Sequence, residues 1–483
     1  MDLWKNIEAE IQAQRLAMWR QLALEQQSIA EKLCLDELES EKSRLLAINP
    51  GDELEIVEAG DYEVRDLNGV FTFKTWKLMR GKRVVKSNRG GLQRRNGDSA
   101  AKTSDWRELS LRRISGDTSI RAHADTLNRL APPEAKISHI TLANGIIGEG
   151  LAIDAALDKA VAKLGTVAPL PEADLAVAKL DEAEVKLLVV TTVPKAYQKE
   201  AMANPVPLTD PKLTLTLTAD AVFCKKQAEE RGPVQKDAEG NRIKKPRPSR
   251  RERKQAKAER GGRKTVSTAC GTLSAPGQGK VTLAARSYAQ LFQRFLGLMQ
   301  ARDLRGITLC LFSDGEKLIR EWALTILVGK VKGFHQILDW YHLHTKVGDL
   351  LSPALKDIDR RLKEWIKLDE MLYHGAVDSA IAHLRSIQAE QIRNPKKIDE
   401  LITYLEARRD QIPVYSIRKK LGLPLSSNQA EKACDLCVSH RQKGRGMAWS
   451  ADGSYALAVI RATIVSGWLK SWLDSSSIEL KAG

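Results

Sequence analysis

Cysteine is scarce in this sequence and scattered along it. The 483 residues hold six cysteines, which argues against the disulfide framework of a small secreted protein. They are Cys34, Cys224, Cys270, Cys310, Cys434 and Cys437. The last two form a CxxC pair without a second pair, which is a weak zinc signal. Helical spacing would also place both on one face, so we favour packing in a core and keep zinc as the alternative.

Long apolar runs are also lacking, although 43% of the residues are hydrophobic. No run approaches the roughly 18 apolar residues that a membrane helix needs. The first residues, Met1 to Lys5, carry charge early and lack the apolar centre of a signal peptide. We therefore expect a cytoplasmic protein that does not enter a membrane, with enough apolar residues to build about two to four domains.

Acidic residues are too few to balance the basic ones. The chain has 61 Asp and Glu against 77 Lys and Arg, so its formal net charge is +16 and its pI is near 9.4. Because Lys and Arg displace condensed counterions from phosphates, this excess favours a polyanion, most simply nucleic acid. We expect DNA as the partner and a nucleoid-associated location in the cytoplasm.

The first segment, residues 1–105, is predicted to hold a long helix and a small β-meander. Apolar residues recur at helical spacing from Leu3 to Ile48, where Asn49-Pro50-Gly51 ends the pattern. This helix is either a coiled coil that joins two copies of the chain, or a helix packed on its own domain. From Glu53 to Lys86 the pattern alternates around a turn signal, which is typical of β-strands.

Residues 106–165 are predicted to form two helices around a turn. The first covers Ile120 to Leu130, a Pro-Pro break follows, and Ser138 can cap the second. This order fits a helix-turn-helix, whose second helix enters a DNA major groove, and fits a plain helical hairpin equally well. Residues 166–205 are predicted to be a linker, in which Val185–Val190 forms a strand that leads into the next domain.

Residues 206–345 carry an order of elements that predicts an RNase H-like mixed sheet. Three β-like runs come first, followed by a helix, a buried strand and another helix. The three β-like runs are Lys212–Asp220, Thr265–Leu273 and Lys280–Ala285, and the buried strand is Ile307–Asp314. In an RNase H-like fold the first and fourth strands are neighbours, so we expect Asp220 and Asp314, each at the end of a strand, to lie side by side.

Two adjacent carboxylates at one edge of a sheet predict a metal site. Such groups repel each other unless a cation lies between them, and oxygen ligands select Mg²⁺ or Mn²⁺. A pair of these ions can clamp the attacking and leaving oxygens of a phosphodiester. The alternative for Asp314 by itself is a cap on the helix that follows it.

The most basic segment of the chain lies between the first two of these strands. Residues 241–264 are dense in Lys and Arg and almost free of apolar residues, so they cannot bury a core. We predict that this loop clamps a DNA backbone. The contacts assigned to it are Arg250, Arg251, Arg253 and Lys254. A solvated loop without a partner is the alternative.

The segments that follow are predicted to be an all-helical insertion, residues 346–422, and a second part of the catalytic domain, residues 423–483. Glu431 enters a helix in the second part, where it is either a third metal ligand or only a capping acid. A basic turn behind it is predicted to contact DNA phosphates. Its residues are Arg441, Lys443 and Arg445.

Asp339 and His342 follow the next β-like run, which begins at Gly333. A histidine three residues after an aspartate can support a metal site or orient a substrate. From these residues alone we favour an ordinary structural hydrogen bond over such a role.

With these residues in place, the chain resembles bacterial insertion-sequence transposases of the DDE class. It is most similar to the ISKra-type group, which is distantly akin to Mutator-like transposases. The resemblance covers roughly residues 110 to 470. It rests on Asp220, Phe312-Ser313-Asp314-Gly315, Ile337-Leu338-Asp339-Trp340-Tyr341-His342, and Asn428-Gln429-Ala430-Glu431-Lys432-Ala433-Cys434 with His440-Arg441 and Gly446-Met447-Ala448-Trp449 behind it.

The resemblance implies an RNase H-like catalytic domain split by a helical insertion, and DNA cleavage and strand transfer with a divalent metal. Asp220, Asp314 and Glu431 match the catalytic, metal-binding acids of the family, and Asp339 and His342 match its Asp-x-x-His signature. Relatives often begin with a zinc ribbon, but residues 1–110 hold only Cys34, so no zinc is expected there. The implied partners are the terminal repeats of a mobile element and target DNA.

Two other functions fit the same residues. One is a DNA-binding protein that descends from a transposase and has no catalysis, although all three acids are present. The other is a metal-dependent DNA nuclease without strand transfer, which the sequence does not separate from a transposase. Self-association is expected only on the basis of the first helix.

Overall fold

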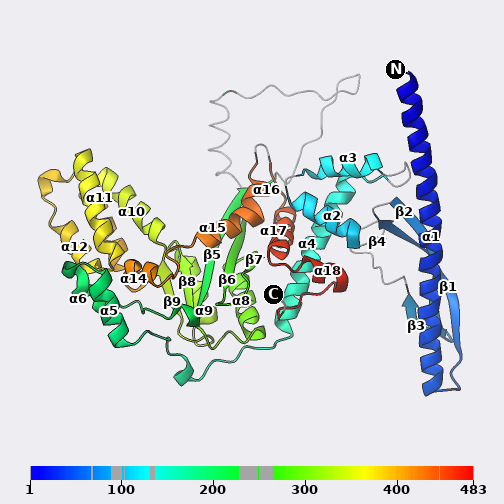
Figure 1. Ribbon diagram of the computed structural model, residues 1–483, viewed down its shortest axis with the longest axis horizontal. Coiled ribbons are helices and arrows are strands. Elements are labelled where there is room, and N and C mark those ends of the chain that lie inside the picture. The colour runs from blue at the N-terminus through cyan, green and yellow to red at the C-terminus, as the bar shows by residue number, and fades with distance from the viewer. Residues whose placement is uncertain are drawn as a thin grey trace. The chain divides into compact units, whose positions relative to one another are not determined.

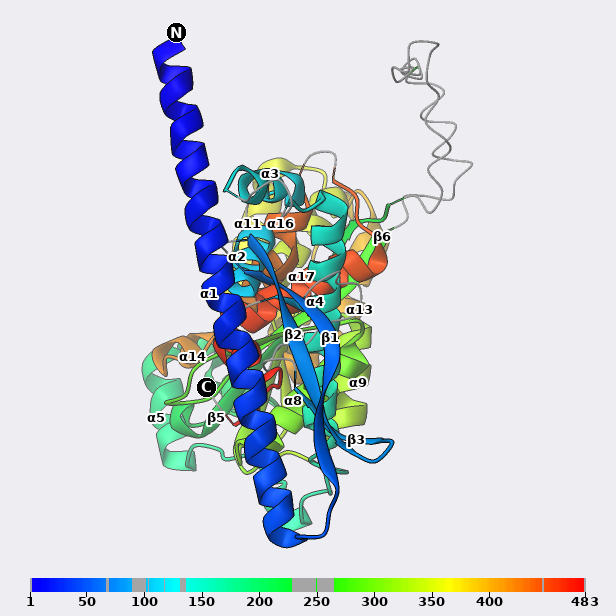
Figure 2. The same ribbon diagram turned by 90° about the vertical axis from the view of Figure 1, so that its right-hand side faces the viewer.

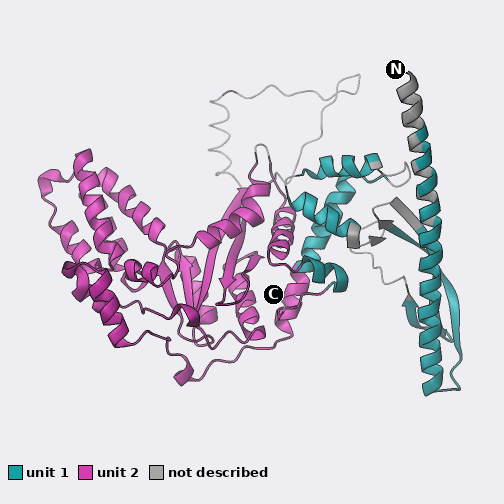
Figure 3. Cartoon of the chain, in the orientation of Figure 1, with its two compact units in different colours: residues 1–153, 469–476 teal, residues 154–468, 477–483 magenta. Residues whose placement is uncertain are grey.

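A computed structural model describes residues 2–66, 69–88, 101–102, 104–116, 118–130, 136–227, 249, 265–444 and 447–481. The chain divides into two compact units (Figure 3). Unit 1 comprises residues 1–153 and 469–476, and unit 2 comprises residues 154–468 and 477–483. Among the described residues, each unit contains one β-sheet.

The first part of unit 1 is a long helix packed on a small sheet. Helix α1 (Asp2–Ile48) ends before Asn49-Pro50-Gly51, as predicted. Strands β1 (Leu54–Asp66), β2 (Gly69–Arg80) and β3 (Arg83–Asn88) form the predicted antiparallel meander, and β4 (Ala101–Lys102) runs parallel to β1. In both views α1 lies along β1 and β2 (Figures 1 and 2).

The contact between α1 and this sheet is apolar. Cys34 of α1 belongs to a buried cluster with Val64 and Phe73 of the sheet. One turn further along the helix, Leu38 packs with Leu78 in a second buried cluster. The C-terminal half of α1 is therefore a helix packed on its own domain, which was one of the two alternatives for it.

Unit 1 continues with α2 (Ser104–Ser115), α3 (Ile120–Leu130) and the part of α4 (His139–Ala162) up to Ile153, and it includes α18 (Leu469–Ser475). Both predicted helices of the 106–165 segment are present. Ser138 caps α4, because its Oγ accepts a hydrogen bond from the Thr141 backbone N–H at 3.0 Å. The Asn128 side chain bonds both backbone groups of Ile137 and so ties α3 to the start of α4.

Helix α4 is the one helix of the described residues that is long and apolar enough to cross a membrane, by length and composition. A core helix of a water-soluble protein passes the same criterion. Glu149 of α4 is only 5% exposed and accepts hydrogen bonds from the Arg107 Nε (2.8 Å) and the Trp472 Nε1 (3.2 Å). At this point α4 is an interior helix of unit 1, with its acid satisfied by protein donors.

Unit 2 is built on a mixed five-stranded sheet with the order β7-β6-β5-β8-β9. The strands are β5 (Thr214–Lys225), β6 (Thr265–Ser274), β7 (Val281–Ala285), β8 (Thr308–Ser313) and β9 (His335–Leu338). Strands β5, β6 and β7 pair antiparallel, whereas β5, β8 and β9 pair parallel. The expected adjacency of the first and fourth strands, β5 and β8, is confirmed.

Close packing holds the centre of this sheet. A Cβ at Gly271 of β6 would lie 2.6 Å from the Thr218 carbonyl oxygen of β5, so a larger residue would push the two strands apart. Helix α8 (Tyr288–Ala301) packs against β6 and β7 and contacts α9 (Lys317–Leu327). The Ser287 Oγ accepts a hydrogen bond from the Gln290 N–H at 3.2 Å and caps α8.

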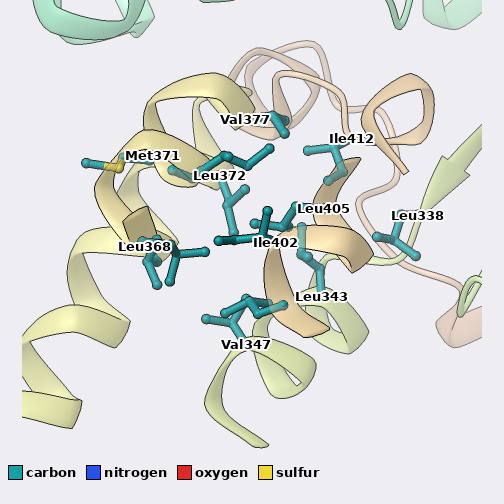
Figure 4. Packing of buried hydrophobic residues seen from close by; sticks show 14 of the residues in the cluster. Leu338, Leu343, Val347, Leu368, Met371, Leu372, Val377, Ile402, Leu405 and Ile412 are labelled. Atoms are coloured by element: carbon teal, nitrogen blue, oxygen red, sulfur yellow. The ribbon is translucent and has the colours of Figure 1, made fainter. Parts of the chain in front are cut away.

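Between β9 and residue 420 the chain is mainly helical. The helices are α10 (Trp340–Ala354), α11 (Ile358–Tyr373), α12 (Val377–Arg385), α13 (Pro395–Glu406) and α14 (Tyr415–Lys420). Their apolar faces share one buried core with β8 and β9 (Figure 4). Phe312 of β8 and Leu338 of β9 belong to that core, so the helices are anchored directly on the sheet.

The last elements of unit 2 return to the sheet. Helix α15 (Asn428–Cys434) packs against β5 and β6, and it continues through a π-helical turn (Asp435–Ser439) into α16 (His440–Gln442). Helix α17 (Ala451–Val465) follows. Gly467, with φ 75°, separates α17 from α18.

The predicted strand at Val185–Val190 is also wrong. These residues lie in α5 (Glu182–Thr192), ahead of the short helix α6 (Gln198–Met202). The Asp181 Oδ1 accepts a hydrogen bond from the Glu184 N–H at 2.8 Å, which caps α5. This cap and the apolar contacts of Val189 and Val193 in one buried cluster override the β propensity of the run. At the level of fold class the chain is α/β, as predicted.

Candidate active site

Asp220 and Asp314 occupy equivalent positions on two neighbouring parallel strands. The last paired residues of β5 and β8 are Thr218 and Phe312. Each acid lies two residues beyond that pair, so the two acids stand at the same level. Strand β5 does not end at Asp220, as the sequence predicted, but continues to Lys225 because β6 pairs with it over that length. The two acids therefore lie at the point where β8 ends and β5 continues.

The charge environment of Asp220 confirms this proximity. Burial raises the pKa of the Asp220 carboxyl above its ordinary value, the Ala221 backbone N–H lowers it, and the charges of Asp314 and Glu316 raise it further. The Ala221 N–H donates to the Asp220 Oδ1 at 2.7 Å. Asp220 is thus a partly buried carboxylate in a negative environment, which a cation would relieve.

Glu316 is an acid of this site that the sequence analysis did not identify. The Asp314 Oδ1 accepts a hydrogen bond from the Glu316 backbone N–H at 2.8 Å, which forms an Asx-turn after β8. This turn places Glu316 beside α8, where its Oε2 accepts a hydrogen bond from the Tyr288 hydroxyl at 2.7 Å. Burial and this bond to Glu316 raise the Tyr288 pKa above its ordinary value. The acid two residues after Asp314 was the available signal.

Glycine is required within this turn. Gly315 has φ +89°, a conformation that side chains rarely adopt. A Cβ there would also lie 2.8 Å from the Arg408 Nε and 3.0 Å from the Leu338 Cδ1. The Arg408 Nη2 donates to the Gly315 carbonyl at 3.1 Å. Asp314 is therefore the first residue of a turn and lies close to Asp220. The capping alternative is wrong, because the N-cap position of α9 is Glu316 and no side chain caps that helix.

Glu431 reaches the same region from α15. Its Oε1 lies 3.1 Å from the His342 Nε2 at the start of α10, and both side chains are exposed to solvent, at 56% and 43%. One turn along α15, the Cys434 Sγ lies 4.0 Å from the Asp220 Oδ2. Helix α15 thus contacts Asp220 through Cys434. Glu431 precedes Cys434 by three residues and therefore lies on the same side of this helix.

Asp339 is fully buried and joins the starts of α10 and α15. Its Oδ1 accepts a hydrogen bond from the His342 backbone N–H at 2.9 Å and so caps α10. Its Oδ2 accepts hydrogen bonds from the backbone N–H of Ser427 and from the Ser427 Oγ, the latter at 2.9 Å. Ser427 directly precedes α15. Asp339 and His342 therefore link the two helix starts, which agrees with a supporting role.

The CxxC cysteines lie in the buried part of unit 2, close to a third cysteine. Cys434 and Cys437 are buried beside Cys270 of β6, and hydrogen bonding to these two thiols together with burial raises the Cys270 pKa well above its ordinary value. In the part of the chain that the structure describes, no group of three or more His, Cys, Asp or Glu side chains is already arranged to hold a metal ion. The cysteines are placed as core packing predicts.

Most of the predicted DNA contacts fall outside the described residues. This applies to Arg250, Arg251, Arg253, Lys254 and Arg445. Lys443 is exposed. Arg441 is only 5% exposed, and its guanidinium lies 5.1 Å from the centre of the Trp449 ring. A guanidinium packed in this way supports the fold of the turn, so the prediction that Arg441 grips a surface phosphate needs correction.

Comparison with known proteins adds no assignment: no protein-family model matches the chain, and no curated protein is similar to it. The function must therefore be inferred from the sheet of unit 2, from the charge of the chain, and from four acids of unit 2. These acids are Asp220, Asp314, Glu316 and Glu431.

Proposed function

We propose that this protein is a DDE transposase, which cleaves the DNA at the ends of a mobile element and joins them to target DNA. The observation that carries the proposal is the equivalent position of Asp220 and Asp314 on neighbouring parallel strands, with Glu431 nearby on α15. The strand order β7-β6-β5-β8-β9 is the order of an RNase H-like fold, and α10 to α14 stand where a helical insertion before the third acid belongs.

The donor set fits a hard divalent cation. Asp220, Asp314 and Glu431 offer only oxygen ligands, which suit Mg²⁺ or Mn²⁺. Burial first, and then the charges of Asp314 and Glu316, raise the pKa of Asp220. When bound, such an ion lowers the pKa of water and neutralises charge on a phosphodiester. In the structure Glu431 contacts His342, so His342 holds this carboxylate at the edge of the site.

The remaining residues of the site position these acids. Asp339 fixes the starts of α10 and α15 relative to each other through Ser427, and the Glu316 backbone N–H holds the Asp314 carboxylate within the turn. In the proposed reaction water first attacks a phosphodiester and releases a 3′-OH. That hydroxyl then attacks a phosphodiester of the target, so each step exchanges one P–O bond for another. Rigid placement of the acids serves both steps.

The charge of the chain supports DNA as the substrate. A net charge of +16 favours binding to phosphates, and the basic segment 241–264 follows β5, the strand that carries Asp220. In unit 1, α3 and α4 with the Ser138 cap are proposed to act as a helix-turn-helix that recognises the terminal repeats. Lys443, which directly follows α16, is an exposed cation.

The test is cleavage of labelled element-end DNA by the full-length protein with Mg²⁺. Asp220→Asn, Asp314→Asn and Glu431→Gln should each reduce the cleavage rate by roughly 100-fold or more, because each loses a charge worth several kcal/mol in the transition state. Glu321→Gln is the matched control, since Glu321 is a half-exposed acid of α9 that pairs with Lys317 at 3.3 Å. Full activity of all three site variants would overturn the proposal.

The same assay separates the two other functions. Cleavage without joined products on added target DNA would identify a nuclease without strand transfer. Binding of element ends by the parent protein, with no cleavage in Mg²⁺ or Mn²⁺, would identify a DNA-binding protein without catalysis. In the last case the three substitutions would leave binding unchanged.

A further inference from the structure

Arg408 reaches the turn that follows β8 from the helical part of unit 2. It lies two residues beyond the end of α13, and its Nη2 donates a hydrogen bond to the Gly315 carbonyl oxygen at 3.1 Å. The neighbouring Arg409 is exposed and pairs with the acid Asp378. The Arg408 guanidinium instead binds a backbone carbonyl directly beside Asp314.

The direction of the Arg408 side chain is fixed by its surroundings. Leu405 before it and Ile412 after it are fully buried in the core that α10 to α14 share with β8 and β9 (Figure 4). The guanidinium carbon lies 4.1 Å from the centre of the Tyr404 ring, which is a cation–π contact. A long side chain is therefore held in a defined position against Gly315.

The Tyr404 ring itself lies close to the acids of the site. Burial raises the pKa of Tyr404, the charge of Arg408 lowers it, and the charges of Asp314 and Asp339 raise it further. Because the effect of a charge falls with distance, the end of α13 belongs to the surroundings of Asp314.

Arg408 contacts the peptide that joins Gly315 to Glu316. The carbonyl of this peptide accepts the hydrogen bond from Arg408, and its N–H donates to the Asp314 Oδ1 at 2.8 Å. A peptide bond is planar and trans, so its carbonyl and its N–H rotate together as one unit. The direction of the carbonyl therefore sets the direction of the N–H that holds the Asp314 carboxylate.

This peptide needs a contact from outside the turn to keep its direction. Gly315 has φ +89° and lacks a Cβ, so its backbone can adopt many angles. Strand β9 holds the start of the turn, since the Gln336 Nε2 donates to the Ser313 Oγ at 2.7 Å. Arg408 holds the end. A charged donor also polarises the carbonyl and so strengthens the N–H bond to Asp314.

We infer that Arg408 is a positioning residue for Asp314, the proposed metal-binding acid, which it orients through the peptide between Gly315 and Glu316. A helical segment that the sequence places in the insertion thereby helps to shape the site. The expected effect on metal binding and cleavage rests on the proposed function, whereas the hydrogen-bonded link itself is tested without it.

The link is tested by hydrogen–deuterium exchange of the Glu316 backbone amide in the full-length protein without metal or DNA. Arg408→Met keeps an unbranched side chain against Tyr404 but cannot donate, so exchange at this amide should become roughly tenfold faster. Arg408→Lys keeps the charge and a donor, and it should restore most of the protection. Arg409→Met is the matched control and should exchange like the parent.

Metal binding and cleavage are measured on the same proteins. Mn²⁺ binding to the DNA-free protein, followed by electron paramagnetic resonance, should weaken by roughly tenfold in Arg408→Met, and so should the cleavage rate at limiting Mg²⁺. Saturating Mg²⁺ should recover most of that rate, and the affinity for DNA should match that of the parent. A general loss of structure would not produce this dependence on metal concentration.

The outcomes separate this inference from the proposed function. Unchanged Glu316 exchange or unchanged Mn²⁺ affinity in Arg408→Met, or equal changes in Arg409→Met, would overturn the inference alone. A parent protein that neither binds Mn²⁺ nor cleaves DNA would overturn the proposed function and with it the metal-binding role of Asp314. If Arg408→Met did not fold, Arg408→Gln would replace it, with a smaller increase in exchange because its amide can still donate.

Discussion

Asp220 on β5 and Asp314 after β8 stand at the same level of two parallel strands, each two residues beyond the last pair, Thr218 with Phe312. Backbone pairing thus brings two carboxylates together that are far apart in the sequence. The raised pKa of Asp220 shows the cost of this arrangement, to which burial and the charge of Asp314 both contribute.

This cost predicts a stability effect that is independent of activity. Asp220→Asn should raise the Tm in EDTA by roughly 2 °C, because it removes a partly buried charge beside Asp314. At a pH below the ordinary Asp pKa of 3.8, residue 220 is uncharged in both the parent and the variant, so the difference in Tm should vanish. Calorimetry at neutral and at acid pH measures the difference in Tm between the parent and the variant. A parent protein more stable than the variant at neutral pH without metal would contradict the prediction.

The Tyr288–Glu316 hydrogen bond (2.7 Å) should be worth a measurable coupling energy. Tyr288 is 7% exposed, and a bond from a buried hydroxyl to a charged group contributes about 1.5–3 kcal/mol. Denaturant unfolding of the parent, Tyr288→Phe, Glu316→Gln and the double variant completes a double-mutant cycle. A coupling energy indistinguishable from zero would mean that the two side chains do not act together.

Asp339 is expected to be the most sensitive supporting residue. Asn at this position keeps one acceptor oxygen but turns an amide NH₂ toward the other donors. Asp339→Asn should therefore destabilise unit 2 by about 2–4 kcal/mol and should also reduce cleavage, because the start of α15 loses its anchor at Ser427. Ser427→Ala removes one of the three bonds and should cost about 1 kcal/mol.

A matched control exists for Asp339. Asp357 also caps a helix, since its Oδ2 accepts a hydrogen bond from the Arg360 N–H of α11 at 2.7 Å, but it is exposed. Asp357→Asn should cost less than about 1 kcal/mol and leave cleavage unchanged. Equal effects of the two substitutions would show that Asp339 acts only as an ordinary cap.

The parts of the fold that the sequence predicted correctly are those set by local pattern. β-like runs located β5 and β6, and the helical periodicity of α1 with its Asn49-Pro50-Gly51 end located that helix. The order of these elements then brought Asp220 beside Asp314. Both acids were found because each lies close to the end of a predicted run.

The parts that the sequence did not predict depend on contacts between distant residues. Strand β5 continues past Asp220 because β6 pairs with it to Lys225. Val185–Val190 is helical because Asp181 caps it and the fold buries Val189. The bond from Tyr288 to Glu316 joins α8 to the turn after β8, and no local pattern marks such a contact.

A last prediction concerns His335 of β9, which is buried close to Arg418. Burial, and next the charge of Arg418, lower the His335 pKa from 6.5 to about 4. The His335 Nε2 has no hydrogen-bond partner within the described residues. The neighbouring charge is that of a cation, so the folded protein strongly favours the neutral imidazole.

The sign of the resulting pH dependence follows from proton binding. Between pH 6.5 and 4 the unfolded chain binds a proton at this histidine and the folded chain does not, so the free energy of unfolding falls as the pH is lowered. A shift of this size corresponds to about 3 kcal/mol. Denaturant unfolding of unit 2 from pH 7.5 to 4.5 should show this loss, and His335→Leu should show correspondingly less of it. His139→Gln, which changes an exposed imidazole of α4, should keep the parent slope; a His335→Leu variant with that same slope would refute the assignment.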